Sequence, residues 1–301
     1  MQQMKSGRAL RVLMLISGLF WSQQAAVAQD QSLFWSIESD QGHAGYLLGT
    51  IHSEDPRVLE YTEAFLASLQ GSSQFAMELV PDLSTLSKLA DAMVLPEGTE
   101  LASIIGDERF ETIVSVLSNY GIPAVQVAKM QPWAAMITLS VPKPKTGFFM
   151  DFSLSLRASG SGLKVIGLET LEDQLGFLQE MPLEHQLTML DQAVLEIDRV
   201  QEIHDQMVTT YLEGDLLTLL ADTEAQLSEM GKDARDYFMN EGISHRNHRM
   251  LKSMLTALKS GTVFTAVGSL HLPGEEGLIH LLRNSGYQLK PMPSPFPPQV
   301  K

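Results

Sequence analysis

Cysteine is absent from this chain of 301 residues. Disulfide bonds therefore cannot stabilise the fold, a thiol nucleophile is excluded, and no cysteine is present to carry a lipid anchor. Burial of hydrophobic side chains must stabilise the protein instead, and these make up 44% of the residues. A chain of this length can bury a core large enough for that purpose.

Basic residues are also scarce, since 21 Lys and Arg stand against 36 Asp and Glu. The formal net charge of −15 at pH 7 argues against nucleic acid as a partner, because phosphates repel an acidic protein. The same acidity suits a protein that gathers divalent cations. Solubility explains the acidity equally well.

Uninterrupted apolar runs of about 20 residues, which a bilayer-spanning helix requires, are missing as well. A shorter apolar run near the N-terminus follows Lys5, Arg8 and Arg11 and precedes the small residues Ala26 and Ala28. This pattern is typical of a secretory signal peptide. We expect cleavage after Ala28, which removes residues 1–28 and leaves 273 residues with 18 basic and 36 acidic side chains, a net charge of −18. The mature protein is then periplasmic or secreted, with no stable membrane insertion.

Strand-like and helix-like segments alternate at both ends of the chain. Strands are predicted at 33–39, 44–51, 73–79, 163–170, 261–271 and 287–292. Helices are predicted at 58–71, 127–140 and 274–286, over 82–120 with a break at 96–99, and as several helices over 171–258 that are punctuated by Pro182, Gly214 and Gly231. This order predicts an α/β fold, with a central β-sheet from N- and C-terminal βα units and a large helical insert. We expect one domain over residues 29–292. Residues 141–151 are predicted to form a surface loop or mobile flap, and the Pro-rich tail 293–301 is predicted to be disordered.

Two predicted strands end in the same way. The segment "YLLGTIH" places Gly49 three residues before His52, and "VGSLH" places Gly268 three residues before His271. Glycine lets the chain leave a strand sharply and lets another group approach the backbone closely. Because open α/β sheets bind ligands beyond the carboxyl ends of their strands, we expect one site built from both ends of the chain. A histidine at a strand end can also be a satisfied structural group, and the sequence leaves that alternative open.

Two imidazoles and a carboxylate form a usual ligand set for a catalytic divalent metal, with a position left for water. His52 and His271 would supply the nitrogens. Glu78 and Glu169 are the candidate carboxylates, because each lies at the end of a short apolar run. A bound cation lowers the pKa of its water, and a nearby carboxylate can accept the proton. No His-Glu-x-x-His or Gly-x-Ser-x-Gly motif is present, so metal-dependent or plain acid–base chemistry remains.

The segment "SHRNHRM" adds further candidates. His245 and His248 lie three residues apart on a predicted helix, where such a pair is usually solvated rather than metal-binding. Arg246 could clamp a substrate carboxylate or the catalytic glutamate if this helix points at the site, and Asn247 lies beside it. The remaining histidines, His43, His185, His204 and His280, show no partner pattern.

These motifs, in this order, resemble the TraB/GumN family, which includes the Tiki-like metalloproteases and is related to the ChaN and erythromycin-esterase groups. The resemblance rests on "YLLGTIH", "AMEL", "KMQPW", "GLET", "RN" and "VGSLHLPGEEGL", and it covers roughly residues 33–292. It implies an EreA/ChaN-like fold. It also implies a divalent metal, Mn, Co or Zn, held by His52, His271 and Glu78. Glu78 is the acidic partner of Tiki-like enzymes, and Glu169, Arg246 and Asn247 would line the same cleft as catalytic residues.

Three functions are compatible with these observations. The first is an exported metal-dependent hydrolase, a peptidase acting on a peptide or protein substrate. The second is a non-catalytic protein that binds haem or a metal complex in the same cleft. The third is an interaction module of the cell envelope in which the motifs only maintain the fold.

Overall fold

The structure is a computed structural model that describes residues 32–298. The predicted signal peptide at 1–28 lies outside the described residues. Within them, a six-stranded mixed sheet has the order β4-β3-β5-β2-β1-β6. The strands are β1 (Phe34–Ser39), β2 (Gly42–Thr50), β3 (Gln74–Met77), β4 (Lys164–Gly167), β5 (Val263–Gly268) and β6 (Gln288–Pro291). Every strand predicted from the sequence is present, and the mixed α/β class is confirmed.

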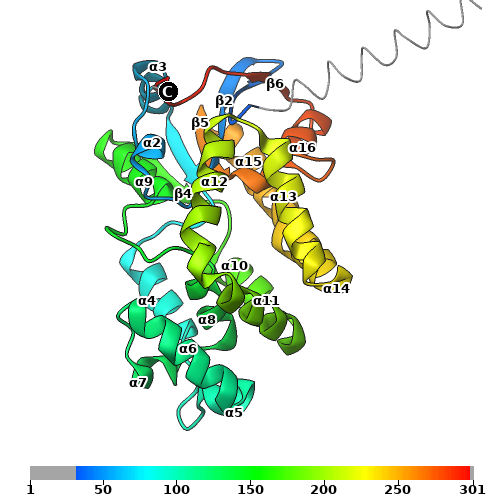
Figure 1. Ribbon diagram of the computed structural model, residues 1–301. Helices are drawn as coiled ribbons and strands as arrows, with labels where there is room; N and C mark the ends of the chain where they lie inside the picture. Colours follow the sequence, from blue (N-terminus) through cyan, green and yellow to red (C-terminus); the bar gives the residue numbers. More distant parts are fainter. Residues whose placement is uncertain (1–31, 299–301) are drawn as a thin grey trace, which may run out of the picture.

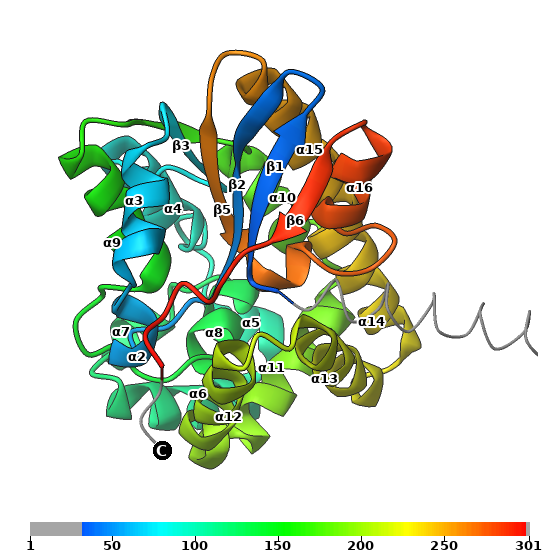
Figure 2. The same ribbon diagram turned by 90° about the horizontal axis from the view of Figure 1, so that it is seen from above.

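The sheet joins the two ends of the chain. β2, β5, β3 and β4 run parallel to one another, whereas β1 pairs antiparallel with both β2 and β6. Parallel neighbours require crossover connections, and helices supply them here. Figure 2 shows α3 (Glu63–Gln70) and α9 (Met150–Gly160) on one side of the sheet, and α15 (His245–Leu258) and α16 (Leu278–Asn284) on the other. The short helix α2 (Pro56–Leu59) precedes α3.

The helical insert is divided by β4 into two parts. In Figure 1 most of its helices lie below the sheet, whereas the second part also rises beside it. The part before β4 contains α4 (Leu83–Ala92), α5 (Leu101–Ile105), α6 (Asp107–Asn119), α7 (Ala124–Val127) and α8 (Pro132–Leu139). The part after β4 contains α10 (Leu171–Gln179), α11 (Leu183–Leu195), the 3-10 turn η1 (Ile197–Arg199), α12 (Val200–Leu212), α13 (Leu216–Glu229), α14 (Lys232–Tyr237) and the π-helix η2 (Phe238–Ser244).

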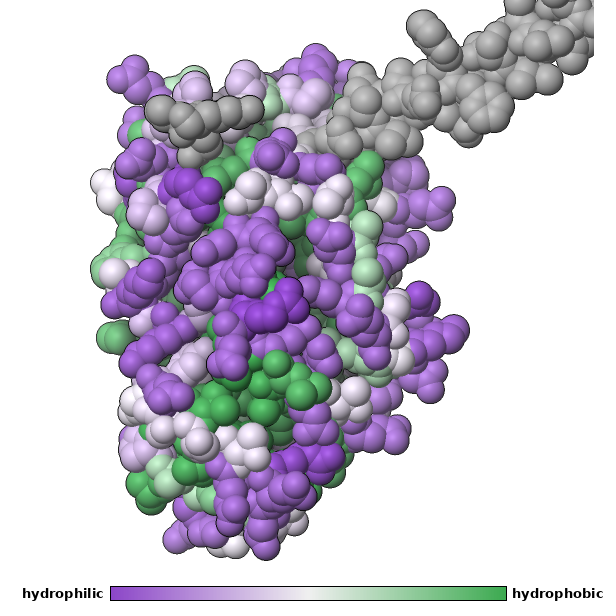
Figure 3. Space-filling model, viewed as in Figure 1, coloured by the Kyte–Doolittle hydropathy of each residue, from purple (hydrophilic) through white to green (hydrophobic). Residues whose placement is uncertain are grey.

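Two main apolar cores hold these parts. The larger lies around the sheet and includes Trp35, Phe75 and Phe264, each fully buried. The second lies among the insert helices and includes Leu101 and Leu117. Figure 3 shows a mostly hydrophilic face in which apolar side chains gather in a patch over the insert helices. Among residues 32–298, no helix has both the length and the apolar character needed to cross a membrane.

Side-chain caps explain several helix boundaries. Thr62 accepts a hydrogen bond from the backbone N–H of Phe65 and begins α3, so the single helix predicted over 58–71 is split into α2 and α3. Pro132 begins α8 without a side-chain cap, because its fixed φ suits the first helical position and its missing N–H costs no bond there, and the helix predicted over 127–140 is interrupted before it. At α10, Thr170 and Asp173 form a reciprocal capping box. This capping box fixes where the second part of the insert begins after β4.

Two further segments differ from the sequence prediction. The pattern predicts no helix between 152 and 162, but α9 occupies residues 150–160 and buries Met150, Leu154 and Ala158 against the sheet core. The predicted disorder of the tail is wrong for its described part. Phe296 is buried, and the Pro295 carbonyl accepts a hydrogen bond from the Thr62 N–H. Burial of the aromatic ring supplies the free energy that holds this part in place.

Candidate functional site

Four of the predicted site residues follow the carboxyl ends of the four parallel strands. Strand register places Thr50 beside Gly268 and Met77 beside both Ala266 and Gly167. The residues that come next along the chain therefore emerge at one edge of the sheet, and they include His52, Glu78, Glu169 and His271. Both ends of the chain therefore contribute to one edge of the sheet, and the prediction that this edge is one functional site stays a prediction.

The glycine of the second motif has a definite role. The Gly268 N–H donates a hydrogen bond to Glu78 Oε1 at 2.7 Å. A Cβ at this position would lie 3.2 Å from that same oxygen. The Gly268 backbone has φ −51° and ψ 136°, which other residues also adopt. Close approach of the carboxylate, rather than a sharp turn, is therefore the reason for glycine here.

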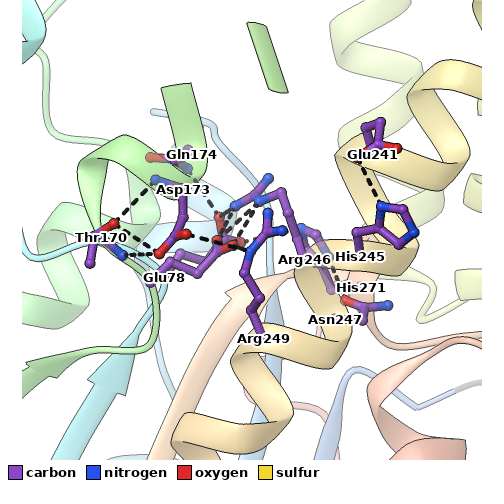
Figure 4. A network of polar contacts seen from close by, with 11 residues as sticks. Glu78, Thr170, Asp173, Gln174, Glu241, His245, Arg246, Asn247, Arg249 and His271 are labelled. Carbon is purple, nitrogen blue, oxygen red and sulfur yellow. Dashed lines mark hydrogen bonds and ion pairs between the residues drawn. The ribbon is translucent and has the colours of Figure 1, made fainter. Parts of the chain in front are cut away.

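Arg246 joins the two glutamates. Its Nη2 donates to Glu78 Oε2 at 2.7 Å and to Glu169 Oε2 at 2.6 Å, and its Nε donates to Glu169 Oε2 at 3.0 Å. The side chain of Glu169 is fully inaccessible, and that of Arg246 is 10% exposed. Arg246 therefore clamps the two glutamates through Nε and Nη2. Figure 4 shows this cluster, with Arg249 pointing toward Asp173 at its margin.

The two carboxylates have opposite pKa shifts. Burial raises the pKa of Glu169 above its ordinary value, and the adjacent Glu78 adds to this, despite the opposing effect of Arg246. For Glu78, burial acts in the same direction, but His271, Arg246 and the Gly268 N–H outweigh it and the pKa is lowered. Glu78 is therefore the carboxylate held ionised at this edge of the sheet.

Asn247 fixes the histidine of the second motif. Asn247 Nδ2 donates to the Glu276 carbonyl at 2.7 Å, so its Oδ1 is the atom that lies 2.7 Å from His271 Nδ1. His271 Nδ1 must then carry the hydrogen, and Nε2 presents a lone pair 3.7 Å from Glu78 Oε1. Burial lowers the pKa of His271 to about 4, and Arg246 adds to this against the pull of Glu78. His271 is therefore neutral at pH 7.

His52 has a different environment. Its side chain is 64% exposed, and its ring stacks on Phe149 with a centroid distance of 3.9 Å. His52 Nδ1 lies 3.6 Å from Asp151 Oδ2, and Thr50 Oγ1 donates to the other Asp151 oxygen at 2.5 Å. The sequence reasoning missed Asp151, because the helix that begins just before it, α9, was not predicted. Its position after a Pro- and Gly-containing loop was the available signal.

Two neighbouring hollows meet at this edge. One has a volume of about 390 Å³ and is lined by Glu78, Asp151 and Gln174 among others. The other has a volume of about 470 Å³ and includes Arg246 and His271 in its lining. Thr50, His52 and Gly268 line both hollows. His52 is thus brought to the same cavity system as Glu78 on one side and His271 on the other.

The exposed histidines of α15 do not join this cluster. His245 Nδ1 lies 2.8 Å from Glu241, and His248 Nε2 lies 2.7 Å from Glu276, with more than half of each histidine side chain exposed. They pair with acidic side chains on the outside of the helix. Arg246 and Asn247, which lie between them in sequence, are buried and face the site. Because an α-helix has about 3.6 residues per turn, His245 and His248 lie on its outer face while Arg246 and Asn247 lie on the face toward the site.

The donor set suits a divalent cation only in part. His271 Nε2 and Glu78 Oε1 face each other, and the Asn247 contact to the far ring nitrogen is the support that ligand histidines usually have. Among residues 32–298, however, no group of three His, Asp or Glu side chains lies close enough to share one ion. Two donors are in place, and His52 is the nearby exposed candidate for the third.

The fold and this site define an α/β domain with a buried Glu–Arg–Glu cluster and a neutral histidine at the carboxyl edge of its sheet. The chain belongs to the TraB/PrgY/gumN family, whose sequence model matches residues 33–291. No solved structure matches the chain. The relation to the EreA/ChaN-like folds therefore stays a prediction.

Curated relatives include proteins named metalloproteases. The chain is 24% identical over 318 residues to Metalloprotease TIKI1 of Danio rerio, which covers 88% of this chain and 64% of the relative. Metalloprotease TIKI2 of Xenopus tropicalis is 22% identical, and the alignment covers 87% of this chain and 60% of the relative. YbaP of Escherichia coli is 23% identical over 247 residues, and the alignment covers 79% of this chain and 87% of the relative. The chain thus spans somewhat under two thirds of the length of these Tiki relatives.

Proposed function

We propose that this protein is an exported metal-dependent hydrolase, a peptidase, with its active site at the carboxyl edge of the sheet. The observation that carries this proposal is the pairing of His271 Nε2 with Glu78 Oε1 at 3.7 Å, beside a hollow that His52 also lines. A neutral imidazole and an ionised carboxylate together can bind a cation or move a proton.

His271, Glu78 and His52 would hold the ion. When bound, a divalent cation polarises a substrate carbonyl and makes a water molecule more acidic. His52 can reach this position only by moving away from Phe149 and Asp151, and its exposed side chain permits such a rotation. Glu78 acts either as a ligand or as the base that accepts the proton of the attacking water.

The other predicted catalytic residues have positioning roles. Arg246 holds the Glu78 carboxylate, Glu169 anchors Arg246, and neither of them lines the hollow that Glu78 lines. Asn247 is fully buried and holds His271 in the tautomer with an unprotonated Nε2. Asp151 lies beside His52 and would orient its ring. Substitution of these residues would alter the geometry of the site without removing a reacting group.

Export and a peptide substrate are parts of the same proposal. The pattern of residues 1–28 supports export. The names of the Tiki relatives support a protein or peptide as the substrate. Neither point depends on the identity of the metal, for which Mn, Co and Zn remain the candidates.

The test measures binding of Mn²⁺, Co²⁺ and Zn²⁺ by calorimetry, together with the metal content of the purified protein and hydrolysis of a broad peptide library. We expect about one ion per chain and loss of both binding and hydrolysis in His271→Ala and His52→Ala. His43→Ala is the matched control, because His43 lies near the opposite end of the same strand, β2. Undiminished metal binding in the His52 and His271 double variant would refute the proposal. A shift of the haem Soret band without hydrolysis would instead favour the binding-protein alternative.

A further inference from the structure

The larger of the two hollows is lined mainly by apolar side chains. It lies between the carboxyl edge of the sheet and the helices of the insert, with walls from α8, α10, α11, α12, α13 and η2. Fourteen of its 27 lining residues have apolar side chains, among them Met189, Met207, Met230 and Phe238. A volume of about 470 Å³ is within the usual range for ligand pockets. The cavity is therefore large enough to hold part of a substrate.

This cavity is continuous with the candidate catalytic groups. Thr50, His52 and Gly268 line it and also line the smaller hollow that contains Glu78 and Asp151. A group held at the shared boundary would thus have an apolar chamber on one side and carboxylates on the other. The two sides would select for different chemical groups.

The wall formed by η2 helps to shape the cavity. The wide π-helix brings Gly242 against Phe177, where an added Cβ would lie 3.0 Å from the ring. Phe177 and Ile243 both line the chamber beside this contact. Methionines on α11, on α12 and just after α13 also line the chamber, and their flexible side chains can adapt to apolar groups of different shape.

We propose that this cavity is the specificity subsite of the enzyme, and that it holds a bulky apolar side chain of a polypeptide next to the bond to be cleaved. The substrate class is therefore a peptide with Leu, Met or Phe at one position beside that bond. This inference rests on the proposed peptidase function. A charged side chain would lose hydration against the fourteen apolar side chains of the lining, so the cavity favours an apolar one.

Hydrolysis of matched peptides tests this assignment. The peptides differ at one position, which carries Leu, Met, Phe, Ser or Asp. We expect kcat/KM to be at least about tenfold higher for the Leu peptide than for the Ser peptide, as for other apolar pockets. Met207→Glu places a charge on the rim, where Met207 is 41% exposed, and should reduce the Leu-to-Ser ratio. Val125→Glu changes an apolar side chain that is 71% exposed outside the cavity and should leave the ratio unchanged.

A second variant and a binding assay keep the outcomes distinct. Ala193→Phe fills the chamber from α11 and should lower the same ratio. Fluorescence polarisation with labelled Leu and Ser peptides reports binding even where no hydrolysis occurs, so a failure of the catalytic proposal is separable from a failure of the subsite. Stronger binding of the Leu peptide that is lost in Met207→Glu supports the subsite. An equal response to all five peptides would overturn the subsite, because the cavity would then show no selectivity. Displacement of the Leu peptide by dodecanoate at far lower concentrations than by unlabelled Leu peptide would overturn it in favour of an acyl ligand.

Discussion

Acidification should destabilise this protein through His271. Burial lowers the pKa of this residue from 6.5 to about 4 in the folded state. The unfolded chain therefore binds more protons than the folded chain between these values, and the free energy of unfolding must decrease as the pH falls through this window. The contribution of neutral His271 to the free energy of unfolding is fully present above pH 6.5.

The size of this effect follows from the two pKa values. Lowering the pH from 7.5 to 5 should reduce the free energy of unfolding by about 2 kcal/mol through His271 alone, since one pKa unit corresponds to roughly 1.4 kcal/mol. Glu169 acts in the opposite sense at lower pH, because its pKa is raised. A comparison with His271→Gln separates the histidine from every other titrating group.

The assay is urea unfolding of chelator-treated protein at pH 7.5 and pH 5, for the wild type, His271→Gln and His43→Gln. We expect the stability difference between the wild type and His271→Gln to shrink by about 2 kcal/mol at pH 5. The exposed His43→Gln variant should retain the wild-type pH dependence. If the difference between the wild type and His271→Gln is the same at both pH values, His271 is not held neutral by burial and the assigned tautomer loses its support.

Two further changes should affect stability. Arg246→Met leaves Glu78 and Glu169 without their common guanidinium and should cost about 3–5 kcal/mol in urea unfolding, whereas Arg249→Met, with a side chain 41% exposed, should cost less than about 1 kcal/mol. Equal losses in these two variants would contradict the described clamp. Phe296→Ala removes a buried ring from the C-terminal segment and should cost about 3–5 kcal/mol by the same measurement. A loss below about 0.5 kcal/mol, typical of an exposed site, would mean that this segment is not packed.

The sequence was sufficient for the elements whose patterns are local. Short apolar runs bounded by glycine or polar residues marked all six strands, and the order of strands and helices predicted the α/β sheet. The α9 segment was not recognisable because its helical residues, including Ser153 and Ser155, follow a Pro- and Gly-rich loop and do not show a strong apolar stripe. Phe296 was missed for another reason. Its burial depends on packing against the core around the sheet, and nothing in the adjacent Pro-rich sequence indicates that contact.

Most members of the candidate site were predictable from the sequence, with Asp151 the exception, but the task of each residue was not. Strand ends supplied His52, Glu78, Glu169 and His271, since parallel strands must expose their carboxyl ends at one edge. The tertiary structure alone decides which of two similar carboxylates contacts Gly268 and which is enclosed behind Arg246.

The two Gly-x-x-His motifs illustrate why sequence similarity does not imply equal roles. β5 lies between β3 and β2 in the middle of the sheet, and the 3-10 turn η3 (Ser269–His271) that follows it places His271 in a buried position, 4% exposed. The chain after β2 instead runs out beside the 141–149 loop, and His52 stays exposed against Phe149. His271 is thus ordered before any ligand arrives, whereas His52 must lose its side-chain freedom on binding, which costs up to about 1.5 kcal/mol. The affinity of the site for a cation should therefore depend more strongly on what holds His52 than on what holds His271.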